Sequence, residues 1–384
     1  MKGSRLGIGS TVGWLGWMAM GFGGCAPPEK DADEAVRRQW TEQEAADWFA
    51  DQARPIGMNY APRTAVNQLE MWQAETWDPD TIDQELAWAD EVGFNTARVF
   101  LHDQVWEQDG DAYLDRIDDF LDIADSHGIR VMLVFFDGVW HPNPVSGPQP
   151  EPTPGVHNSQ WVQSPGAEVL ADATRMAELE PYVTAVVRAF RDDPRVLVWD
   201  LFNEPDNSNL LSYGDLELDA TIKSERALEL LILAKEWAMA EEPVQPLTAG
   251  VYQGEWSDPE KLSPLNAFML QELDVVSFHT YSDAVTVSVQ VSALQAYGRP
   301  LLCTEYMARP LESTFQDILP VFDAEDVGAY NWGFVDGRIQ TLYSWGSWLV
   351  PEDETPEVWF HDVLHADGTP FDAAEIEAIG AFGR

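Results

Sequence analysis

The sequence predicts an α/β fold, a single (β/α)8 TIM barrel in which parallel strands close into a ring and helices cover the outside. Two observations predict it. Short apolar runs rich in β-branched and aromatic residues alternate with stretches whose apolar residues recur every three or four positions, as in repeated βα units. Eight such runs follow residue 40, and the roughly 340 residues that contain them suit the size of this fold.

The eight predicted strands follow one another in chain order. They are Pro55 to Tyr60, Asn95 to Leu101, Ile129 to Phe136, Val196 to Asn203, Pro246 to Tyr252, Asp274 to Tyr281, Pro300 to Tyr306 and Val327 to Phe334. Each is followed by a segment that can form a helix. No repeat longer than one βα unit and no linker interrupts this order, so residues 40–384 are predicted to form one catalytic domain.

Helices are predicted between these strands. Thr81 to Val92 and Leu114 to Ser126 place Ile, Leu and Trp or Phe on one face, and a glycine follows each within two residues. Phe371 to Phe382 is the predicted closing helix. The longest irregular segment, Asp137 to Gly166, has six prolines between Pro142 and Pro154 and lies between a strand and its helix, which predicts a long loop on the C-terminal face of the barrel.

The first residues are predicted to direct export. Lys2 and Arg5 precede an apolar run from Ile8 to Phe22, and two glycines lead to Cys25, an order typical of a signal peptide over residues 1–24. This segment resembles a bacterial lipoprotein signal, which implies a lipid on Cys25, although the position of Phe22 usually holds leucine in such signals. An ordinary signal peptide cut nearby is the alternative.

Residues 25–39 are predicted to be a tether, because Ala26 to Asp33 is rich in proline and charge and shows no periodicity. The lipoprotein-like signal implies an exported protein at the outer membrane or cell surface, with a periplasmic or secreted protein as the alternative. The other cysteine, Cys303, lies in an apolar run and is predicted to be a small buried hydrophobic side chain.

The net charge limits the partners. With 66 acidic and 22 basic side chains the chain carries −44, so it will not hold a phosphate backbone, and we exclude nucleic acid as a partner. The acidic residues are scattered, which favours a solvated anionic surface. Seventeen tryptophans suit flat apolar surfaces with one polar edge, including sugar rings, although most are expected in the core. The protein is expected to be a monomer.

Two glutamates stand at predicted strand ends. Glu204 follows the strand that ends at Asn203, and Glu305 lies near the end of another. Because the C-terminal ends of barrel strands converge on one mouth, we expect the two carboxyl groups to face each other. Glycoside hydrolysis requires such a pair, since one group must be protonated to release the leaving sugar oxygen while the other must be ionised to attack or to activate water.

Other polar and aromatic residues stand at the same predicted ends. They are Arg98, Asn203, His279, Tyr281 and Trp332. A guanidinium and a phenol near one carboxyl group would hold it ionised, whereas an apolar setting would raise the pKa of the other toward that of a working acid.

The rim loops carry further candidates. On the long loop, Trp140, His141, Asn158 and Trp161 either line sugar subsites or pin the loop down, and the sequence does not decide between the two. After the last strand, Gln340, Tyr343, Trp345 and Trp348 form an aromatic and polar cluster. Sugar stacking is favoured for this cluster, because so many aromatics in a Gly-Ser loop would otherwise expose apolar area.

Four motifs together resemble one family. They are WDLFNEP (Trp199 to Pro205), TEY (Thr304 to Tyr306), HTY (His279 to Tyr281) and Trp332. In order and spacing they are similar to the clan A retaining glycoside hydrolases, and within the clan to glycoside hydrolase family 5, the cellulase family. The resemblance covers nearly all of the chain after the tether.

The resemblance implies a role for each matched residue. It implies that Glu204 is the acid/base and Glu305 the nucleophile, with their carboxyl groups about 5 to 5.5 Å apart. It also implies that Asn203 holds the sugar 2-hydroxyl, Tyr281 donates to the nucleophile, Arg98 supports its charge, His279 lies near the reacting sugar and Trp332 forms the platform beneath it.

The chain departs from the family at the third strand. Where the family often has a histidine, this chain has Phe136, Asp137 and Gly138. Asp137 or His141 are the candidates to replace it, and Asp137 and Trp140 are predicted to bind substrate.

The sequence thus predicts a retaining glycoside hydrolase that acts without a cofactor on a β-linked polysaccharide or oligosaccharide of the β-1,4-glucan, mannan or xylan type, with endo action favoured. An exo-acting β-glycosidase or β-mannosidase and a noncatalytic glycan-binding lipoprotein are the alternatives. A metal-dependent barrel hydrolase is disfavoured, because no histidines group at strand ends. His361 and His365 follow the last strand and are predicted to be surface histidines.

Overall fold

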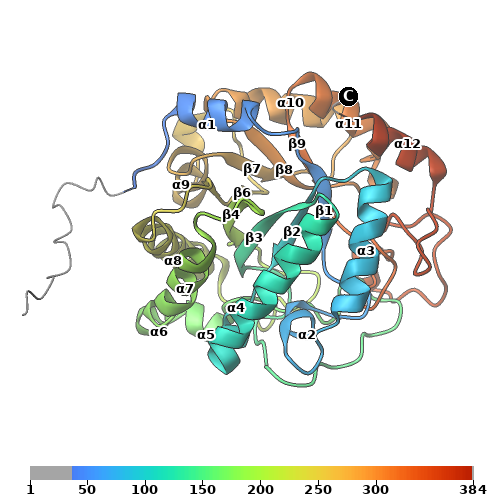
Figure 1. Ribbon diagram of the computed structural model, residues 1–384, viewed down its shortest axis with the longest axis horizontal. Coiled ribbons are helices and arrows are strands. Elements are labelled where there is room, and N and C mark those ends of the chain that lie inside the picture. Colours follow the sequence, from blue (N-terminus) through green and yellow to red (C-terminus); the bar gives the residue numbers. More distant parts are fainter. Residues whose placement is uncertain (1–36, 383–384) are drawn as a thin grey trace, which may run out of the picture. The chain divides into compact units, whose positions relative to one another are not determined.

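The computed structural model describes residues 37–382 and contains a ring of parallel strands surrounded by helices (Figure 1). The predicted signal peptide, Cys25 and all but the last three residues of the predicted tether lie outside the described residues. Within the described part of the chain, no helix is both long enough and apolar enough to cross a membrane.

The strands form one parallel sheet in the order β5-β4-β3-β2-β1-β9-β8-β7-β6. They are β1 (Ile56–Tyr60), β2 (Thr96–Phe100), β3 (Arg130–Asp137), β4 (Val196–Asn203), β5 (Leu247–Thr248), β6 (Gly250–Val251), β7 (Val276–His279), β8 (Leu301–Tyr306) and β9 (Gly328–Asn331). Only Ala249 separates β5, which pairs with β4, from β6, which pairs with β7. The two edges of the sheet are therefore halves of one strand, and the barrel closes with the eight strands that the sequence predicts.

The α-helices of the described chain lie on the outside of the barrel and across one end of it (Figure 1). They are α1 (Glu42–Ala50), α2 (Gln68–Trp72), α3 (Pro79–Val92), α4 (Asp103–Ser126), α5 (Ala167–Leu170), α6 (Ala173–Ala177), α7 (Glu180–Phe190), α8 (Ala220–Ala240), α9 (Pro264–Gln271), α10 (Ala284–Gln295), α11 (Phe315–Ala324) and α12 (Ala373–Ala381). Short 3-10 turns are η1 (Pro259–Lys261), η2 (Arg309–Leu311) and η3 (Trp345–Trp348).

The three predicted helices are present. The first is α3, which the Asp78 side chain caps and which ends at Gly93 with φ 105°, a left-handed conformation that glycine adopts without strain. The closing helix is α12. The helix predicted from Leu114 is the second part of the longer α4, whose apolar pattern is interrupted where Asp109 leaves helical geometry (φ −155°, ψ 47°).

Helix α1, which the sequence analysis did not predict, covers the N-terminal end of the barrel. Thr41 and Glu44 form a capping box at its start. Its buried residues Ala45 and Phe49 join a core cluster with residues from the beginnings of several strands, among them Leu197 and Leu302. This end of the barrel is thereby sealed with apolar side chains, which leaves the opposite end for a site.

The first described residues already bind the barrel. Arg37 Nη2 donates to Asp274 Oδ2 at 2.7 Å, and Arg37 Nε donates to the Pro243 carbonyl at 2.9 Å. Contacts with the barrel thus begin three residues before the boundary expected at Trp40. Cys303 is fully buried on β8, as predicted.

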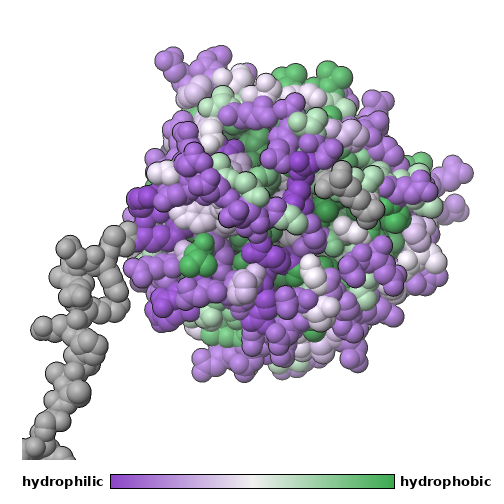
Figure 2. All heavy atoms as spheres, turned by 45° about the horizontal axis from the view of Figure 1, so that its top comes forward, coloured by the Kyte–Doolittle hydropathy of each residue, from purple (hydrophilic) through white to green (hydrophobic). Residues whose placement is uncertain are grey.

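The surface of the barrel is mostly hydrophilic. Hydrophilic residues cover most of the face shown in Figure 2.

Gly57 provides a test of the barrel geometry. It lies on β1 opposite Thr96 of β2, and a Cβ placed on it would come within 1.8 Å of the Thr96 carbonyl oxygen. Gly57→Ala is therefore expected to lower the free energy of unfolding by about 3 kcal/mol or more, because strand pairing must shift to relieve the clash. Denaturant unfolding measures the loss. Gly346→Ala is the control, since its nearest neighbour is Ser344 Oγ at 3.4 Å, and equal stability of the two variants would contradict the strand register.

Candidate active site

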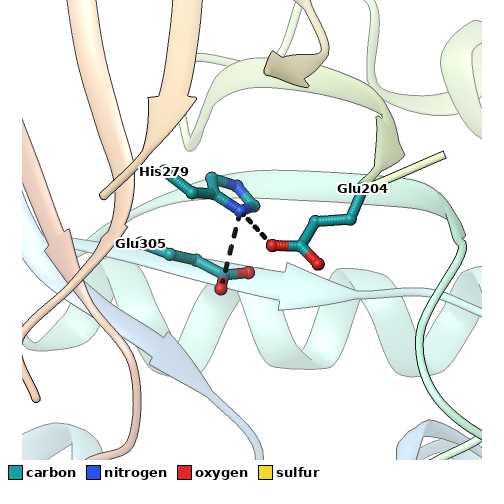
Figure 3. Close-up of side chains that lie close together, drawn as sticks. All are labelled: Glu204, His279 and Glu305. Carbon is teal, nitrogen blue, oxygen red and sulfur yellow. Dashed lines mark hydrogen bonds and ion pairs between the residues drawn. The ribbon is translucent and has the colours of Figure 1, made fainter. Parts of the chain in front are cut away.

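Glu204 and Glu305 meet at the C-terminal mouth of the barrel, as the strand positions predict. Glu305 lies on β8, and Glu204 follows β4 with a positive φ of 40°, a conformation that is uncommon for a non-glycine residue. Between them lies His279, whose Nδ1 is 2.8 Å from Glu204 Oε1 and 3.6 Å from Glu305 Oε2 (Figure 3). One carboxylate oxygen from each glutamate and a ring nitrogen of His279 all lie within 4.8 Å of one another.

Glu305 is held by two donors. Arg98 Nη1 donates to Oε1 at 3.2 Å, and the Tyr281 hydroxyl donates to Oε2 at 2.8 Å. Burial raises the pKa of Glu305 to about 7, while His279, Arg98 and the Tyr281 hydroxyl act in the opposite direction. Each carboxylate oxygen of ionised Glu305 therefore accepts a hydrogen bond from a protein side chain.

Glu204 has a different environment. Its Oε2 accepts a hydrogen bond from Asn207 Nδ2 at 2.6 Å, and burial raises its pKa to about 7. Two buried carboxyl groups this close titrate as a pair. Because the guanidinium and phenol donate to Glu305, we infer that a single proton shared by the pair resides on Glu204.

Arg98 on β2 organises the floor of the site. It is fully buried, and its guanidinium donates hydrogen bonds to four side chains, one of which is Glu305. The donors and acceptors are Nε to Asp200 Oδ2 (2.9 Å), Nη1 to Asn59 Oδ1 (2.8 Å), Nη1 to Glu305 Oε1 (3.2 Å) and Nη2 to Asn203 Oδ1 (2.7 Å). The position of Asn203 beside the glutamates thus depends on Arg98.

Asp137 takes a different place from the one expected. Its Oδ1 accepts from Asn203 Nδ2 (3.0 Å), and its Oδ2 accepts from Trp161 Nε1 (2.6 Å) and Gln68 Nε2 (3.0 Å). The carboxylate is only 1% exposed and does not line the cavity. Burial raises the pKa of Asp137 to about 7, and its oxygens bind Asn203, Trp161 and Gln68 instead of facing the cavity.

His141, the other candidate for this role, is also outside the cavity lining. Its ring packs edge-on against Tyr213 with 4.5 Å between the centroids, and its Nδ1 accepts from the Asn143 backbone. Neither Asp137 nor His141 therefore lines the cavity.

A cavity of about 250 Å³ opens above the two glutamates. Predicted residues that line it are Trp140, Asn158, Asn203, Tyr281, Trp332 and Trp345. Sequence reasoning missed seven further lining residues: Val139, His157, Asn207, Asn209, Leu210, Leu211 and Tyr252. Of these, only Asn207 could have been predicted from the sequence, because it lies three residues after Glu204 in the same loop.

Trp332 lines this cavity. It is 8% exposed, and its ring meets Phe100 and Trp161 edge-on at 5.8 and 5.7 Å. Trp161, at 2% exposure, packs against Trp332 and does not line the cavity. On the long loop, Trp140 and Asn158 therefore line the cavity, whereas Trp161 packs below it.

The cluster after β9 is mostly structural. Trp345 lines the cavity and meets Tyr281 edge-on at 4.9 Å. Trp348, in contrast, stacks on Trp140 (5.7 Å, 22°), and Tyr343 and Gln340 do not line the cavity. The prediction that this cluster stacks on sugar thus fits the position of Trp345 alone.

His361 is not a surface histidine, contrary to prediction. It is fully buried, its Nδ1–H donates to the Met307 carbonyl at 2.5 Å, and its ring lies 5.4 Å from that of Tyr281. Burial lowers the pKa of His361, so the ring is neutral. The sequence placed it on the surface because it follows the last strand, but the loop that carries it folds back over the barrel mouth. His365 is partly exposed.

The donor set of Glu204, His279 and Glu305 is also of a kind that can hold a metal ion. Here, however, the oxygens of both glutamates already have protein partners, including the positively charged Arg98. A cation at this position would be repelled by the guanidinium and would have to displace these donors.

The fold and the site define a (β/α)8-barrel enzyme with a pair of buried carboxyl groups at its mouth. Residues 58–319 match the model of the family described as Cellulase (glycosyl hydrolase family 5). The chain therefore belongs to glycosyl hydrolase family 5, and it is a glycoside hydrolase.

Solved structures share this fold. An exo-β-1,4-mannosidase from Opitutaceae bacterium strain TAV5 is 18% identical, with a TM-score of 0.61 over 86% of this chain and 59% of that one. The endo-β-1,4-mannanase from Thermotoga petrophila is 13% identical (TM-score 0.56, 87% and 77% covered), and a GH5_18 protein from Streptomyces cattleya in complex with GlcNAc is 14% identical (TM-score 0.55, 86% and 80%). Among curated proteins, none matches the chain.

Proposed function

We propose that the protein is a retaining β-glycosidase in which Glu305 is the nucleophile and Glu204 the acid/base. One observation carries the proposal: two buried carboxyl groups, with oxygens within 4.8 Å of each other, have unlike surroundings. Retaining enzymes hold their carboxyl groups about 5 to 5.5 Å apart, whereas inverting enzymes leave about 6.5 to 9.5 Å for a water molecule. The short separation favours direct attack by a carboxylate.

The reaction is a double displacement. The Glu305 carboxylate attacks the anomeric carbon, the bond to the leaving oxygen breaks, and Glu204 gives its proton to that oxygen. Glu204, now ionised, takes a proton from water as the water oxygen attacks the same carbon, and Glu305 leaves. Two inversions at one carbon give a product with the configuration of the substrate.

The surrounding residues prepare these steps. Arg98 and Tyr281 keep Glu305 ionised, and one amide proton of Asn203 stays free for a sugar hydroxyl because the other binds Asp137. Burial lowers the pKa of His279 to about 4, so this residue contacts Glu204 as a neutral imidazole. Trp332 offers an apolar face to the sugar ring.

The substrate class is a β-linked glucan, mannan or xylan, or its oligosaccharides. Two of the three similar solved structures are named for action on β-1,4-mannosides, so β-mannan and manno-oligosaccharides are the first substrates to test. Product analysis on β-mannan, β-glucan, cellulose and xylan, with Glu305→Ala in parallel, tests the proposal. Sugar release by the native enzyme and none by the variant supports it. Binding without release by the native enzyme supports a noncatalytic glycan-binding protein instead.

The pH profile follows from the shared proton. Activity requires Glu204 protonated and Glu305 ionised, and burial raises the pKa of both to about 7. We therefore expect kcat/KM to fall at low pH as Glu305 gains a proton, and to fall again as pH rises past about 7 and Glu204 loses its own. Glu204→Gln, assayed on an activated aryl glycoside, should lack the alkaline decline. A native kcat/KM that keeps rising above pH 7 would contradict the assignment.

Removal of divalent cations provides a separate test. Both glutamates accept hydrogen bonds from protein side chains and need no metal ion in the proposed mechanism. A chelator is therefore expected to leave kcat/KM unchanged. Loss of activity with the chelator and its return with one metal ion would favour a metal-dependent hydrolase at Glu204, His279 and Glu305.

We also propose that the protein acts outside the cytoplasm, anchored by a lipid on Cys25. The support is the order of basic residues, apolar run, glycines and cysteine at the start of the sequence. Labelling cells with a fatty acid should mark the native protein and not Cys25→Ser, and the variant should leave the membrane fraction. Label on both proteins, or on neither, would contradict the anchor.

A further inference from the structure

Two long loops meet above the barrel mouth. The first, residues 138–166, follows β3, and the second, residues 332–372, follows β9; both lie toward the lower right in Figure 1. The Gln340 amide donates to the Thr153 and Val156 carbonyls at 2.8 and 3.2 Å. The Asn158 backbone donates to Ile339 O (2.9 Å), and the His157 backbone donates to Ser347 Oγ (2.9 Å).

The joined loops form a wall on one side of the mouth. In the sheet, β2 and β1 lie between β3 and β9, so the connection passes over the ends of these two strands. The segment after β1 supports it from below, because Asn67 Nδ2 donates to Gln160 O at 2.8 Å and Arg338 N donates to Arg63 O at 3.0 Å. The wall is therefore fixed to the barrel as well as to itself.

The opposite side of the cavity is more exposed to solvent. There the lining residues follow β4 and β6, and they include Leu210 and Leu211, which are 81% and 48% exposed. Glu204 lies on this side. Because Glu204 protonates the leaving oxygen in the proposed function, the leaving group lies on this exposed side, and the sugar that becomes bound to Glu305 lies toward the wall.

Asn158 stands in this wall with an unused amide. The residue is fully buried and lines the cavity, yet neither its Oδ1 nor its Nδ2 has a hydrogen-bond partner among residues 37–382. Its backbone is fixed with φ 52° by the bond to Ile339. A buried amide without partners is costly, and its acceptor and two donors match neighbouring hydroxyls of a sugar.

We propose that the enzyme is exo-acting: the wall limits the pocket to the sugar at the non-reducing end, and the Asn158 amide binds the hydroxyls of that sugar. This inference rests on the proposed function, and it replaces the endo action that the sequence favoured. The cavity volume of about 250 Å³, near the lower end of the roughly 300–1,000 Å³ usual for small-molecule pockets, fits a short glycone better than a long chain.

Capped oligosaccharides test the closed end. The substrates are β-1,4-linked pentaoses labelled at the reducing end, either free or carrying a benzylidene group on the non-reducing terminal sugar. The native enzyme is expected to remove single sugars from the free substrates, leaving the label on progressively shorter chains, and to spare the capped ones. Internal cleavage of the capped substrates at the same rate as the free ones would overturn exo action but would still support the proposed glycosidase function. Hydrolysis of neither would overturn the proposed function itself.

Asn158→Ala tests the amide. We expect kcat/KM on the free substrates to fall roughly 10- to 100-fold, the size of a lost hydrogen bond to a buried polar group. For the native enzyme, kcat/KM should be lower on deoxy-glycosides that lack the bound hydroxyl than on the parent glycosides. For Asn158→Ala, kcat/KM should be the same on both. Asn143→Ala, an exposed asparagine on the same loop, is the control and should match the native enzyme. Native kcat/KM in a folded Asn158→Ala, checked by thermal unfolding, would overturn the role of Asn158.

Discussion

Glu305→Ala is expected to lose hydrolysis and to regain turnover when azide is supplied. The variant has no carboxylate to attack the anomeric carbon, so the loss in kcat should exceed the roughly 10²- to 10⁴-fold that removal of a general acid or base costs. Azide can enter the space left by the side chain and attack from the same face. A single displacement then gives a glycosyl azide of inverted, α configuration, which NMR identifies.

A matched control separates this result from damage to the fold. Glu354→Ala removes an exposed glutamate on the loop after β9 and should leave activity unchanged. A β-glycosyl azide from Glu305→Ala would show that this residue is the acid/base, and the two roles would then have to be exchanged.

Glu204→Ala is expected to be selective for the leaving group. For sugar leaving groups, kcat should fall roughly 10²- to 10⁴-fold, because the departing oxygen receives no proton. For a 2,4-dinitrophenyl glycoside, whose leaving group needs no proton, formation of the glycosyl-enzyme should continue at nearly the native rate, and azide should then yield a glycosyl azide of retained, β configuration. Rates reduced equally for both kinds of leaving group would contradict an acid role for Glu204.

The barrel was predictable because its signals are local. Each strand is a short apolar run bounded by turns, and the eight predicted strands cover β1 to β9, including the strand that Ala249 divides into β5 and β6. The positions of Glu204 and Glu305 followed from the same signals, since a residue at the end of a barrel strand faces the mouth whatever the remaining sequence does.

The rim was not predictable in the same way, because its contacts join distant parts of the chain. The backbone of Asn158 is held by a hydrogen bond to Ile339, and the side chain of Gln340 by hydrogen bonds to Thr153 and Val156. No spacing within either loop indicates its partner in the other. The same reason explains why His361, which looked like a surface residue, is buried beside Tyr281.

Asp137 shows a further limit of sequence reasoning. A carboxylate at a strand end predicts a functional contact, but the structure satisfies both of its oxygens with Asn203, Trp161, Gln68 and the Val139 backbone. Apart from Val139, these donors lie more than 20 residues away from Asp137 in the sequence. The sequence near Asp137 therefore does not indicate whether its carboxylate faces the ligand or supports a neighbouring residue that does.

Trapping the covalent intermediate tests the central claim most directly. A 2-deoxy-2-fluoro glycoside with an activated leaving group, made with the sugar that the enzyme hydrolyses, should inactivate the enzyme because the fluorine slows release from the nucleophile. Mass spectrometry of the digested protein is predicted to find one glycosyl group, on the peptide that contains Glu305. A label on Glu204 or another residue, or a first hydrolysis product of inverted configuration, would contradict the account.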